Sequence, residues 1–474
     1  MTDLISSLPA LVLGIGGMVL LLGGVLAKKT DTVPAVTFGA VVLLIIAWVL
    51  CQIVPDGVVF GGLFKTSFYT RYADTLVYLG AAAALILSGD FNKREKIARF
   101  EYPILVLFAV LGMIVMISAA DMMSLYIGFE LQSLALYICA ALARDSLRST
   151  EAGLKYFVLG ALASGLLIYG ISLVYGFAGT TNFAALAGVF QQGDAGEGTI
   201  VGVVFVLVGL AFKISAAPFH MWAPDVYEGA PSSVTALFAT APKVAAMALL
   251  VSVMAGPFGH LLHQWQMLVV ILSATSMIVG GLAGILQSNI KRLLAYSSIG
   301  HMGYALMGLA VGTVAGVQST LVYIAIYVVM SFGAFACVVA MRRQGKAVEQ
   351  ISDLAGLASE HPAFAFAFAI LLWSMAGIPP LFGFFAKLYV FATAFNAGLD
   401  TLSIIGIITA VFSAFYYLRV IKVMYFDKGK PAFDKASAGA GFVMTVCTIV
   451  AMFFVIIPGP LMSVAGAAAR ALMG

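Results

Sequence analysis

The stretch Phe212-Lys213-Ile214-Ser215-Ala216-Ala217-Pro218 decides how this chain folds. It closes an apolar run long enough to cross a membrane, and its lysine lies five positions before a proline. Proline removes a backbone hydrogen-bond donor and clashes with the preceding turn, so a helix must end or break here. Irregular backbone and a charged side chain are tolerated at membrane depth only inside protein or beside a wet cavity. The stretch therefore predicts a broken transmembrane helix that holds a buried lysine.

The composition around this stretch is typical of an integral membrane protein. Of the 474 residues, 62% are hydrophobic and only 10% are charged, and the mean hydropathy is +1.07. Because about 20 apolar residues cross a bilayer as a helix, we expect an all-α integral membrane protein with about fourteen transmembrane helices in one polytopic domain, residues 1–474. The expected spans are 8–27, 34–54, 73–89, 103–119, 122–142, 155–178, 199–218, 232–254, 267–287, 294–313, 318–340, 363–397, 402–422 and 441–464.

A second helix break is expected in the twelfth span, at Gly377-Ile378-Pro379-Pro380. This break and the one at Pro218 lie five spans apart, in helices of opposite direction. Paired broken helices in this relation are typical of transporters built from inverted repeats. We therefore expect a three-helix segment, a first inverted repeat (spans four to eight), a second one (spans nine to thirteen) and a final helix, over residues 1–102, 103–254, 267–425 and 441–464.

The basic residues of the connecting loops lie mainly on one side of the membrane. Loops after odd-numbered spans hold most of them, whereas the opposite side has Lys65, Arg71 and Arg470. Because basic loops stay on the cytoplasmic side, we expect both termini to face the periplasm or its equivalent. The expected inner-side residues are Lys28, Lys29, Lys93, Arg94, Lys96, Arg99, Arg144, Arg148, Lys291, Arg292, Arg342, Arg343, Lys346, Lys428, Lys430 and Lys435.

Four charged residues interrupt spans that are otherwise apolar: Glu130, Lys213, Lys243 and Lys387. Each costs roughly 3 kcal/mol at the centre of a bilayer, even on lenient insertion scales. Burial disfavours the charged form of a lysine, which suits a side chain that takes up and releases protons. The pattern therefore predicts a proton relay. A static ion pair that pins two helices and lysines that reach back to the interface are the alternatives.

Four motifs carry a resemblance to a known family. They are Phe212–Pro231 (FKISAAPFHMWAPDVYEGAP), Lys291–His301 (KRLLAYSSIGH), Tyr126–Leu134 (YIGFELQSL) and Lys155-Tyr156-Phe157. With these motifs, the whole chain resembles the antiporter-like membrane subunits of respiratory complex I, the NADH–quinone oxidoreductase. The motifs are shared with multisubunit cation/proton antiporters.

Within this family, three features are similar to subunit N, the counterpart of mitochondrial subunit 2, rather than to subunits L and M. Glu130 lies in Gly-Phe-Glu-Leu instead of following a tryptophan. Lys387 stands where subunit M is expected to carry a glutamate. We also expect the chain to end after span fourteen, without the long lateral helix of subunit L.

The resemblance implies roles for the charged residues. Glu130 and Lys213 are expected to form an ion pair whose opening lets Lys213 release its proton. Lys243 would be the central relay, and Lys387 the relay on the exit side or facing a neighbouring subunit.

Two histidines and an inner charged pair are further candidates. His220 and His301 lie within family motifs and could relay protons near neutral pH, although packing is the alternative. Glu151 and Lys155, at the inner end of span six, could form the proton entrance or touch a neighbouring subunit. Interfacial anchoring explains that pair as well.

The implied function is that of a proton-translocating subunit in the membrane arm of NADH–quinone oxidoreductase, in a bacterial inner membrane. The expected partners are the lipid bilayer and other membrane subunits, such as M, K and J, with no nucleic acid. The sequence has no nucleotide-binding loop, flavin motif or cluster-ligating cysteine pattern. We therefore expect no cofactor, metal or redox centre in this chain, and expect other subunits to use NADH, FMN, iron–sulfur clusters and quinone.

Three alternatives remain open at this point. The first is a subunit of a multisubunit sodium/proton antiporter, which shares the same lysines. The second is a structural membrane subunit that pumps nothing. The third is a subunit of a membrane-bound hydrogenase.

Overall fold

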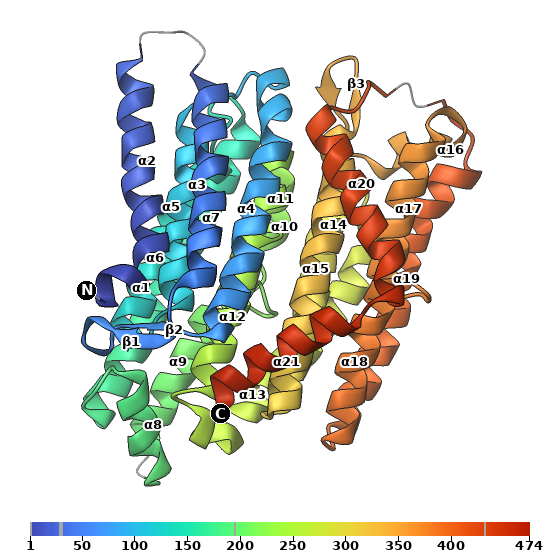
Figure 1. The fold of residues 1–474 in the computed structure, drawn as a ribbon. Coiled ribbons are helices and arrows are strands. Elements are labelled where there is room, and N and C mark those ends of the chain that lie inside the picture. Colours follow the sequence, from blue (N-terminus) through green and yellow to red (C-terminus); the bar gives the residue numbers. More distant parts are fainter. Residues whose placement is uncertain (1, 28–31, 194–195, 431–432) are drawn as a thin grey trace.

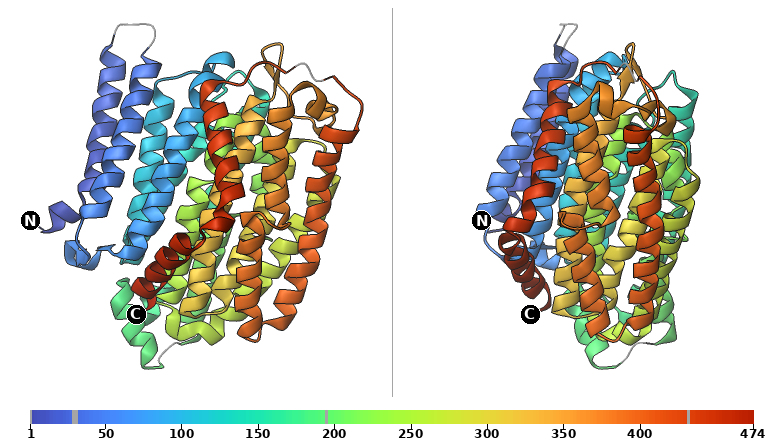
Figure 2. Two further views of the ribbon diagram at one scale, coloured as in Figure 1. Left: turned by 45° about the vertical axis from the view of Figure 1, so that its right-hand side comes forward. Right: turned by 90° about the vertical axis from the view of Figure 1, so that its right-hand side faces the viewer.

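Long apolar helices run side by side through the computed structural model of the protein (Figures 1 and 2), which describes residues 2–27, 32–193, 196–430 and 433–474. Lys28 and Lys29, expected on the inner side, lie outside these ranges. Within the described ranges, eleven helices are long and apolar enough to cross a membrane, and two shorter apolar helices accompany them. The expected all-α membrane fold is confirmed, whereas the number fourteen remains a prediction.

A helix or helix pair occupies every expected span. These are α2 (Leu8–Leu26), α3 (Val33–Ile53), α4 (Phe68–Arg94), α5 (Glu101–Ile117), α6 (Met122–Ala140), α7 (Leu147–Ala178), α9 (Glu197–Ile214), α11 (Ser232–Phe238) with α12 (Ala241–Ala255), α13 (Leu262–Ala283), α14 (Ile290–Ala310), α15 (Val314–Ala340), α17 (Pro362–Ala376) with α18 (Phe382–Asn396), α19 (Asp400–Phe426) and α20 (Ala438–Phe453).

Short elements complete the described chain. The helices among them are α1 (Thr2–Ser6), α8 (Phe183–Gln191), α10 (Trp222–Gly229), α16 (Leu357–Glu360) and α21 (Gly459–Met473). Two small antiparallel hairpins pair β1 (Gly57–Val59) with β2 (Phe64–Thr66) and β3 (Arg342–Arg343) with β4 (Lys346–Ala347). In Figure 1 the β3–β4 hairpin lies at the upper end of the bundle, whereas the C-terminus lies toward the lower end.

Both expected helix breaks are confirmed. Helix α9 ends at Ile214, the next residue Ser215 is left-handed (φ 61°), and α10 begins only at Trp222. Helix α17 ends at Ala376 before a left-handed Gly377 (φ 80°), and α18 begins at Phe382, beyond Pro379 and Pro380. The proline-rich segments therefore interrupt both helices where the sequence predicted.

The eighth span, expected to be continuous over 232–254, is also broken. Helix α11 ends at Phe238 and α12 begins at Ala241, with Thr240 between them in a non-helical conformation (φ −128°, ψ −93°). Pro242, within the first turn of α12, is the sequence signal for this break, because proline is tolerated at the start of a helix and not in its middle.

The single final helix expected over 441–464 is two helices. Helix α20 ends at Phe453, a short 3-10 turn follows, and α21 begins after Pro458. Figures 1 and 2 show α21 crossing the bundle obliquely, and it packs against α15 and α4. The correction follows from Pro458 and Pro460, which cannot lie in a helix interior.

The centre of the bundle is formed by α11–α12 and α15, which are almost entirely buried, whereas α2 and α3 are mostly exposed and therefore peripheral. Close helix crossings also occur beside this centre. At the crossing of α5 and α6, a Cβ on Gly112 would lie 2.4 Å from the Gln132 backbone nitrogen, so only glycine fits. At the first break Ser215, Ala216 and Ala217 are buried, whereas Pro218 and, at the second break, Pro379 and Pro380 are exposed on the surface of this chain.

Candidate functional site

Lys213, in the last turn of α9, reaches across to α6. Its side chain is buried (4% exposed), and Nζ donates a hydrogen bond to Ser133 Oγ at 2.5 Å. Nζ also lies 4.6 Å from the centre of the Phe129 ring. A hydroxyl oxygen and an aromatic face both stabilise an ammonium without neutralising it.

Glu130 does not form the expected ion pair with Lys213 in this structure. Its carboxylate instead accepts a hydrogen bond from Ser164 Oγ of α7, and that oxygen lies 3.1 Å from Tyr126 Oη. Glu130 and Ser133, the hydrogen-bond partner of Lys213, are three positions apart on α6 and therefore lie on one face of that helix. The two charges are close neighbours held by different hydroxyls.

Lys243, in the first turn of α12, binds the broken end of α9. It is 1% exposed, and Nζ donates to the Ile214 carbonyl and to Ser215 Oγ, both at 2.8 Å. The last carbonyls of a helix lack backbone partners and carry the negative end of the helix dipole, so a cation is stabilised there. The break in α9 thus creates the site that holds Lys243.

Lys387, on α18, binds the other broken helix in the same manner. It is 4% exposed, and Nζ donates to the carbonyls of Met375 at 3.2 Å and Ala376 at 2.9 Å, at the end of α17. Nζ also lies 5.0 Å from the centre of the Tyr304 ring. A Cβ on Gly377 would lie 2.6 Å from Lys387 Cδ, so the left-handed glycine also makes room for this lysine.

His301, on α14, lies near the Lys387 site in a cluster of tyrosines. It is 2% exposed, with Nδ1 2.7 Å from Tyr323 Oη and Nε2 3.3 Å from Tyr417 Oη. Its ring centre is 6.2 Å from that of Tyr304, which lies under Lys387. The cluster therefore extends from His301 to the Lys387 site.

Tyr327, on α15, connects the His301 cluster to the break in the eighth span. Its hydroxyl donates to the Ala239 carbonyl at 2.8 Å and lies 2.8 Å from Ser298 Oγ on α14. Since its one proton goes to Ala239, Ser298 must donate to Tyr327. The break between α11 and α12 frees this carbonyl, four residues before Lys243.

His220 is separate from this row of polar groups. It lies half-buried in the segment between α9 and α10, and its Nδ1 has no hydrogen-bond partner among the described residues. The structure brings His301 to the lysines and leaves His220 apart.

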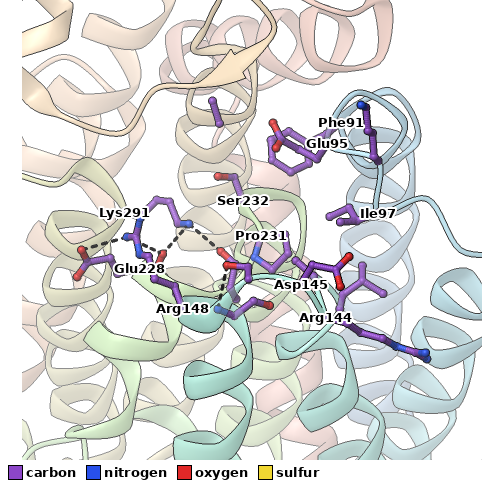
Figure 3. Close-up of a pocket in the computed structure, with 18 of the residues that line it drawn as sticks. Phe91, Glu95, Ile97, Arg144, Asp145, Arg148, Glu228, Pro231, Ser232 and Lys291 are labelled. Carbon is purple, nitrogen blue, oxygen red and sulfur yellow. Dashed lines mark hydrogen bonds and ion pairs between the residues drawn. The ribbon is translucent and has the colours of Figure 1, made fainter.

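A network of charged residues lies at the end of the bundle that carries the basic loops, around a cavity of about 490 Å³ (Figure 3). Figure 3 shows Lys291 beside Glu228. Lys291 Nζ, nearly buried, is 2.9 Å from Glu349 Oε1 and donates to the backbone carbonyls of Glu228 and Ala230. Burial opposes ionisation of Glu349, but Lys291 and Arg148 lower the pKa of Glu349 below its usual value.

Glu151 and Lys155 belong to the same network. Lys155 Nζ is 2.8 Å from Glu151 and 2.9 Å from Asp225, which in turn is 2.6 Å from Arg292. The pair lies at the start of α7, and both side chains are partly exposed. The structure thus links it to α10 and α14.

Sequence reasoning missed the neutral partners of the lysines and one buried acid. Ser133 could have been found by its helical spacing from Glu130, whereas Ser164 and Ser215 give no such signal. Asp74 is 4% exposed and lies six residues after the start of α4. Because the expected span began at residue 73, Asp74 stood at its very end and was not recognised as buried. The thiol of Cys51 approaches it at 3.8 Å, on the side of α4 that faces α3.

The breaks in α9 and α17 present carbonyls to the buried Lys243 and Lys387, and such lysine-holding breaks are typical of an antiporter-like membrane protein. Comparison with known protein families gives the same class. A sequence model of the family described as "NADH:quinone oxidoreductase/Mrp antiporter, TM" matches residues 119–413. The chain is 60% identical to NADH-quinone oxidoreductase subunit N 1 of Acidiphilium cryptum, over 100% of this chain and 99% of the relative. It is 54% identical to subunit N of Rhodospirillum rubrum, over 98% and 97%.

The chain belongs to the subunit N family of the NADH-quinone oxidoreductases. Solved structures agree with this fold. A chain of respiratory complex I from Thermus thermophilus with bound aureothin is 29% identical with a TM-score of 0.82, covering 96% of this chain and 98% of that one. A chain of the Mrp complex from Dietzia sp. is similar in fold alone, at 20% identity and a TM-score of 0.86, over 99% and 100%.

Proposed function

We propose that this chain is the proton-translocating subunit N in the membrane arm of a bacterial NADH–quinone oxidoreductase. The observation that carries the proposal is the way the three lysines within the apolar spans, Lys213, Lys243 and Lys387, are held. Each is hydrogen-bonded to hydroxyl or carbonyl oxygens, and no carboxylate of the described chain is its hydrogen-bond partner. Because neutral acceptors remain neutral when a lysine gives up its proton, such a lysine can be discharged without leaving a buried carboxylate unpaired.

The proposed route follows the polar groups in their spatial order. It runs from Glu130 and Lys213 through Lys243 to the His301 cluster and then to Lys387. Glu130 acts as the switch, because a change of rotamer from Ser164 toward Ser133 would bring its carboxylate to Lys213. We take the arrangement described above as the open state of this switch and the direct ion pair as its closed state.

The two lysine-holding breaks support the proposed inverted repeats, residues 103–254 and 267–425. Helices α9 and α17 both end in a left-handed residue and both offer free carbonyls to a lysine. A relay built from two such units needs hydrogen-bonded groups where the units meet. Tyr327, Ser298 and His301 are placed to supply them.

The remaining chemistry is assigned to other subunits. NADH, FMN, iron–sulfur clusters and quinone would be used elsewhere in the complex, with subunits M, K and J among the proposed neighbours. We place the chain in the bacterial inner membrane with both termini on the periplasmic side, because the basic loops favour the opposite side. Glu151 and Lys155 would then lie near the proton entrance or a subunit contact.

The test is ion translocation by the intact complex in sealed vesicles, with NADH oxidation and proton uptake recorded together. We expect proton uptake that stays proportional to NADH oxidation when sodium is absent from the buffer. Uptake that requires sodium would instead favour a sodium/proton antiporter, the second candidate that the shared fold allows.

A further inference from the structure

An apolar groove of about 600 Å³ lies at the end of the bundle that carries the basic loops, between the first turns of α5 and α7 and the last turns of α6. It is separate from the row of buried lysines, and its lining is mostly apolar. The groove exists because α6 ends at Ala140, while α5 and α7 on either side of it begin near the same level.

The wall of the groove is apolar and partly exposed. Leu105, Ile138, Leu154 and Phe157 line it, and the last three expose about half or more of their surface (56%, 61% and 48%). At 1.5 Å per residue, Leu105 and Phe157 lie about 6 and 15 Å below the starts of their helices. This is the depth of the upper part of a lipid chain below its headgroup.

Two arginines stand at the mouth of the groove, at headgroup level. Arg99 precedes α5, and Arg144 lies in the loop between α6 and α7. Both side chains are exposed, and neither forms an ion pair with the described residues. In Figure 3 the Arg144 side chain points away from Lys291 and Glu228. Glu101 also lines the groove, so its charged groups sum to one positive charge.

We propose that this groove binds one anionic phospholipid from the leaflet on the basic side of the membrane. Arg99 and Arg144 hold the phosphate, since guanidinium groups match phosphate oxygens in charge and geometry. One acyl chain lies along Ile138, Leu154 and Phe157. Basic pockets between transmembrane helices on the cytoplasmic side are suited to anionic headgroups. A zwitterionic lipid is expected to bind more weakly, because its ammonium group is repelled by the two arginines and offsets the attraction of its phosphate.

The test uses phosphatidylglycerol with a photoactivatable group in one acyl chain, added to the intact complex in phosphatidylcholine vesicles. We expect cross-links in the peptide that contains residues 138–157. The Arg99→Gln/Arg144→Gln variant should reduce them about 25-fold, since each of the two arginines near the surface contributes on the order of fivefold to anionic lipid binding. The matched control is Lys428→Gln/Lys430→Gln, which removes the same charge from an exposed loop elsewhere and should leave the cross-links unchanged.

If the glutamine variant does not assemble, two further measurements test the lipid site. Arg99→Lys/Arg144→Lys retains both charges and should retain most of the labelling. In the unmodified complex, an equivalent phosphatidylcholine probe should label the peptide much less than phosphatidylglycerol does. Equal labelling by the two probes would overturn the proposal in favour of ordinary boundary lipid. A neighbouring subunit cross-linked to this peptide, with no lipid labelling, would overturn it in favour of a protein contact.

Discussion

Lys243 uses only part of its hydrogen-bonding capacity. An ammonium has three N–H donors, and two of them go to Ile214 and Ser215. The third is available to a water molecule or to a group that approaches through the α11–α12 break. Lys243 can therefore exchange a proton without releasing the helix end that holds it, which a fully bonded lysine could not do.

The hydroxyl of Tyr327 joins the two halves of the proposed proton route, the His301 cluster and the break beside Lys243. In this structure it gives its proton to the Ala239 carbonyl, which cannot pass a proton on. We expect Tyr327→Phe to slow coupled turnover on the order of tenfold, because the connection between the His301 cluster and the Lys243 break is lost. NADH oxidation and proton uptake in sealed vesicles check this.

The matched control is Tyr72→Phe. Tyr72 is also buried in a span and also donates to a backbone carbonyl, that of Leu321, but it lies outside the proposed route. Both variants should lose about 1–2 kcal/mol of stability. Equal slowing in the two variants would show that Tyr327 acts only in packing.

Single residues could be predicted from the sequence where their presence in a membrane is costly. Glu130, Lys213, Lys243 and Lys387 stand out because charge is rare in apolar spans. Apart from Ser133, which the helical spacing from Glu130 marks, their serine partners do not stand out, since a serine in a transmembrane helix can bond its own backbone at little cost. The prediction of a direct ion pair between Glu130 and Lys213 was wrong for this structure. Nothing in the sequence marks Ser164 as a competing partner of Glu130.

At the scale of elements, the ends of α9 and α17 hold Lys243 and Lys387, whereas Lys213 is held by a serine on the face of α6. Prolines fixed the breaks in α9 and between α17 and α18, and these were predicted. The break between α11 and α12 was not predicted, although Pro242 in the first turn of α12 marks it in the sequence. The carbonyl that this break frees is bonded by Tyr327 from a distant helix, which no local pattern reveals.

Gly377 tests the role of a helix break directly. A Cβ there would meet Lys387, and an alanine would also be strained at φ 80°. We expect Gly377→Ala to displace Lys387 and to reduce coupled turnover on the order of tenfold or more. Its cost in stability should be about 1–3 kcal/mol. Turnover assays and thermal unfolding of the purified complex measure the two effects.

Gly398→Ala is the matched control for this change. Gly398 has nearly the same positive φ (79°), but a Cβ there meets nothing within 4 Å. The Gly398→Ala variant therefore introduces the backbone strain without a contact to a lysine, and it should leave turnover unchanged. A similar loss of turnover in both variants would contradict the contact with Lys387 as the cause.

At the scale of the whole molecule, the charged network around Lys291 and Glu349 joins segments that are far apart in sequence. It connects α7, α10 and α14 to the β3–β4 region. The sequence predicted these basic residues as determinants of orientation. The pairing could not be predicted, since Glu349 lies in a loop and Asp225 and Glu228 lie in the short helix α10, whose positions depend on the complete bundle.

This network predicts a pH dependence of stability. The pKa of Glu349 is lowered in the folded protein. Its stabilisation is therefore complete above the ordinary carboxyl pKa of about 4.3 and is lost as the pH falls through the lowered value. At pH 7, Glu349→Gln should lower the unfolding temperature, because Lys291 stays buried without its partner.

Unfolding temperatures of the two proteins should converge as the pH falls below about 4. Glu360→Gln, a change at an exposed glutamate, should have little effect at either pH. A difference between Glu349→Gln and the unmodified protein that is constant from pH 7 to pH 3 would exclude ionisation of Glu349 as its source.

The measurement that tests the central claim most directly uses Lys243→Met in the intact complex, in sealed vesicles. Methionine keeps the bulk of the side chain and removes its charge. Native gels check assembly, and Lys422→Met, at an exposed lysine, serves as the control. We predict that NADH–quinone electron transfer and proton uptake collapse together in the assembled Lys243→Met complex. Unchanged rates of both would contradict the relay and leave this buried lysine with a structural role alone.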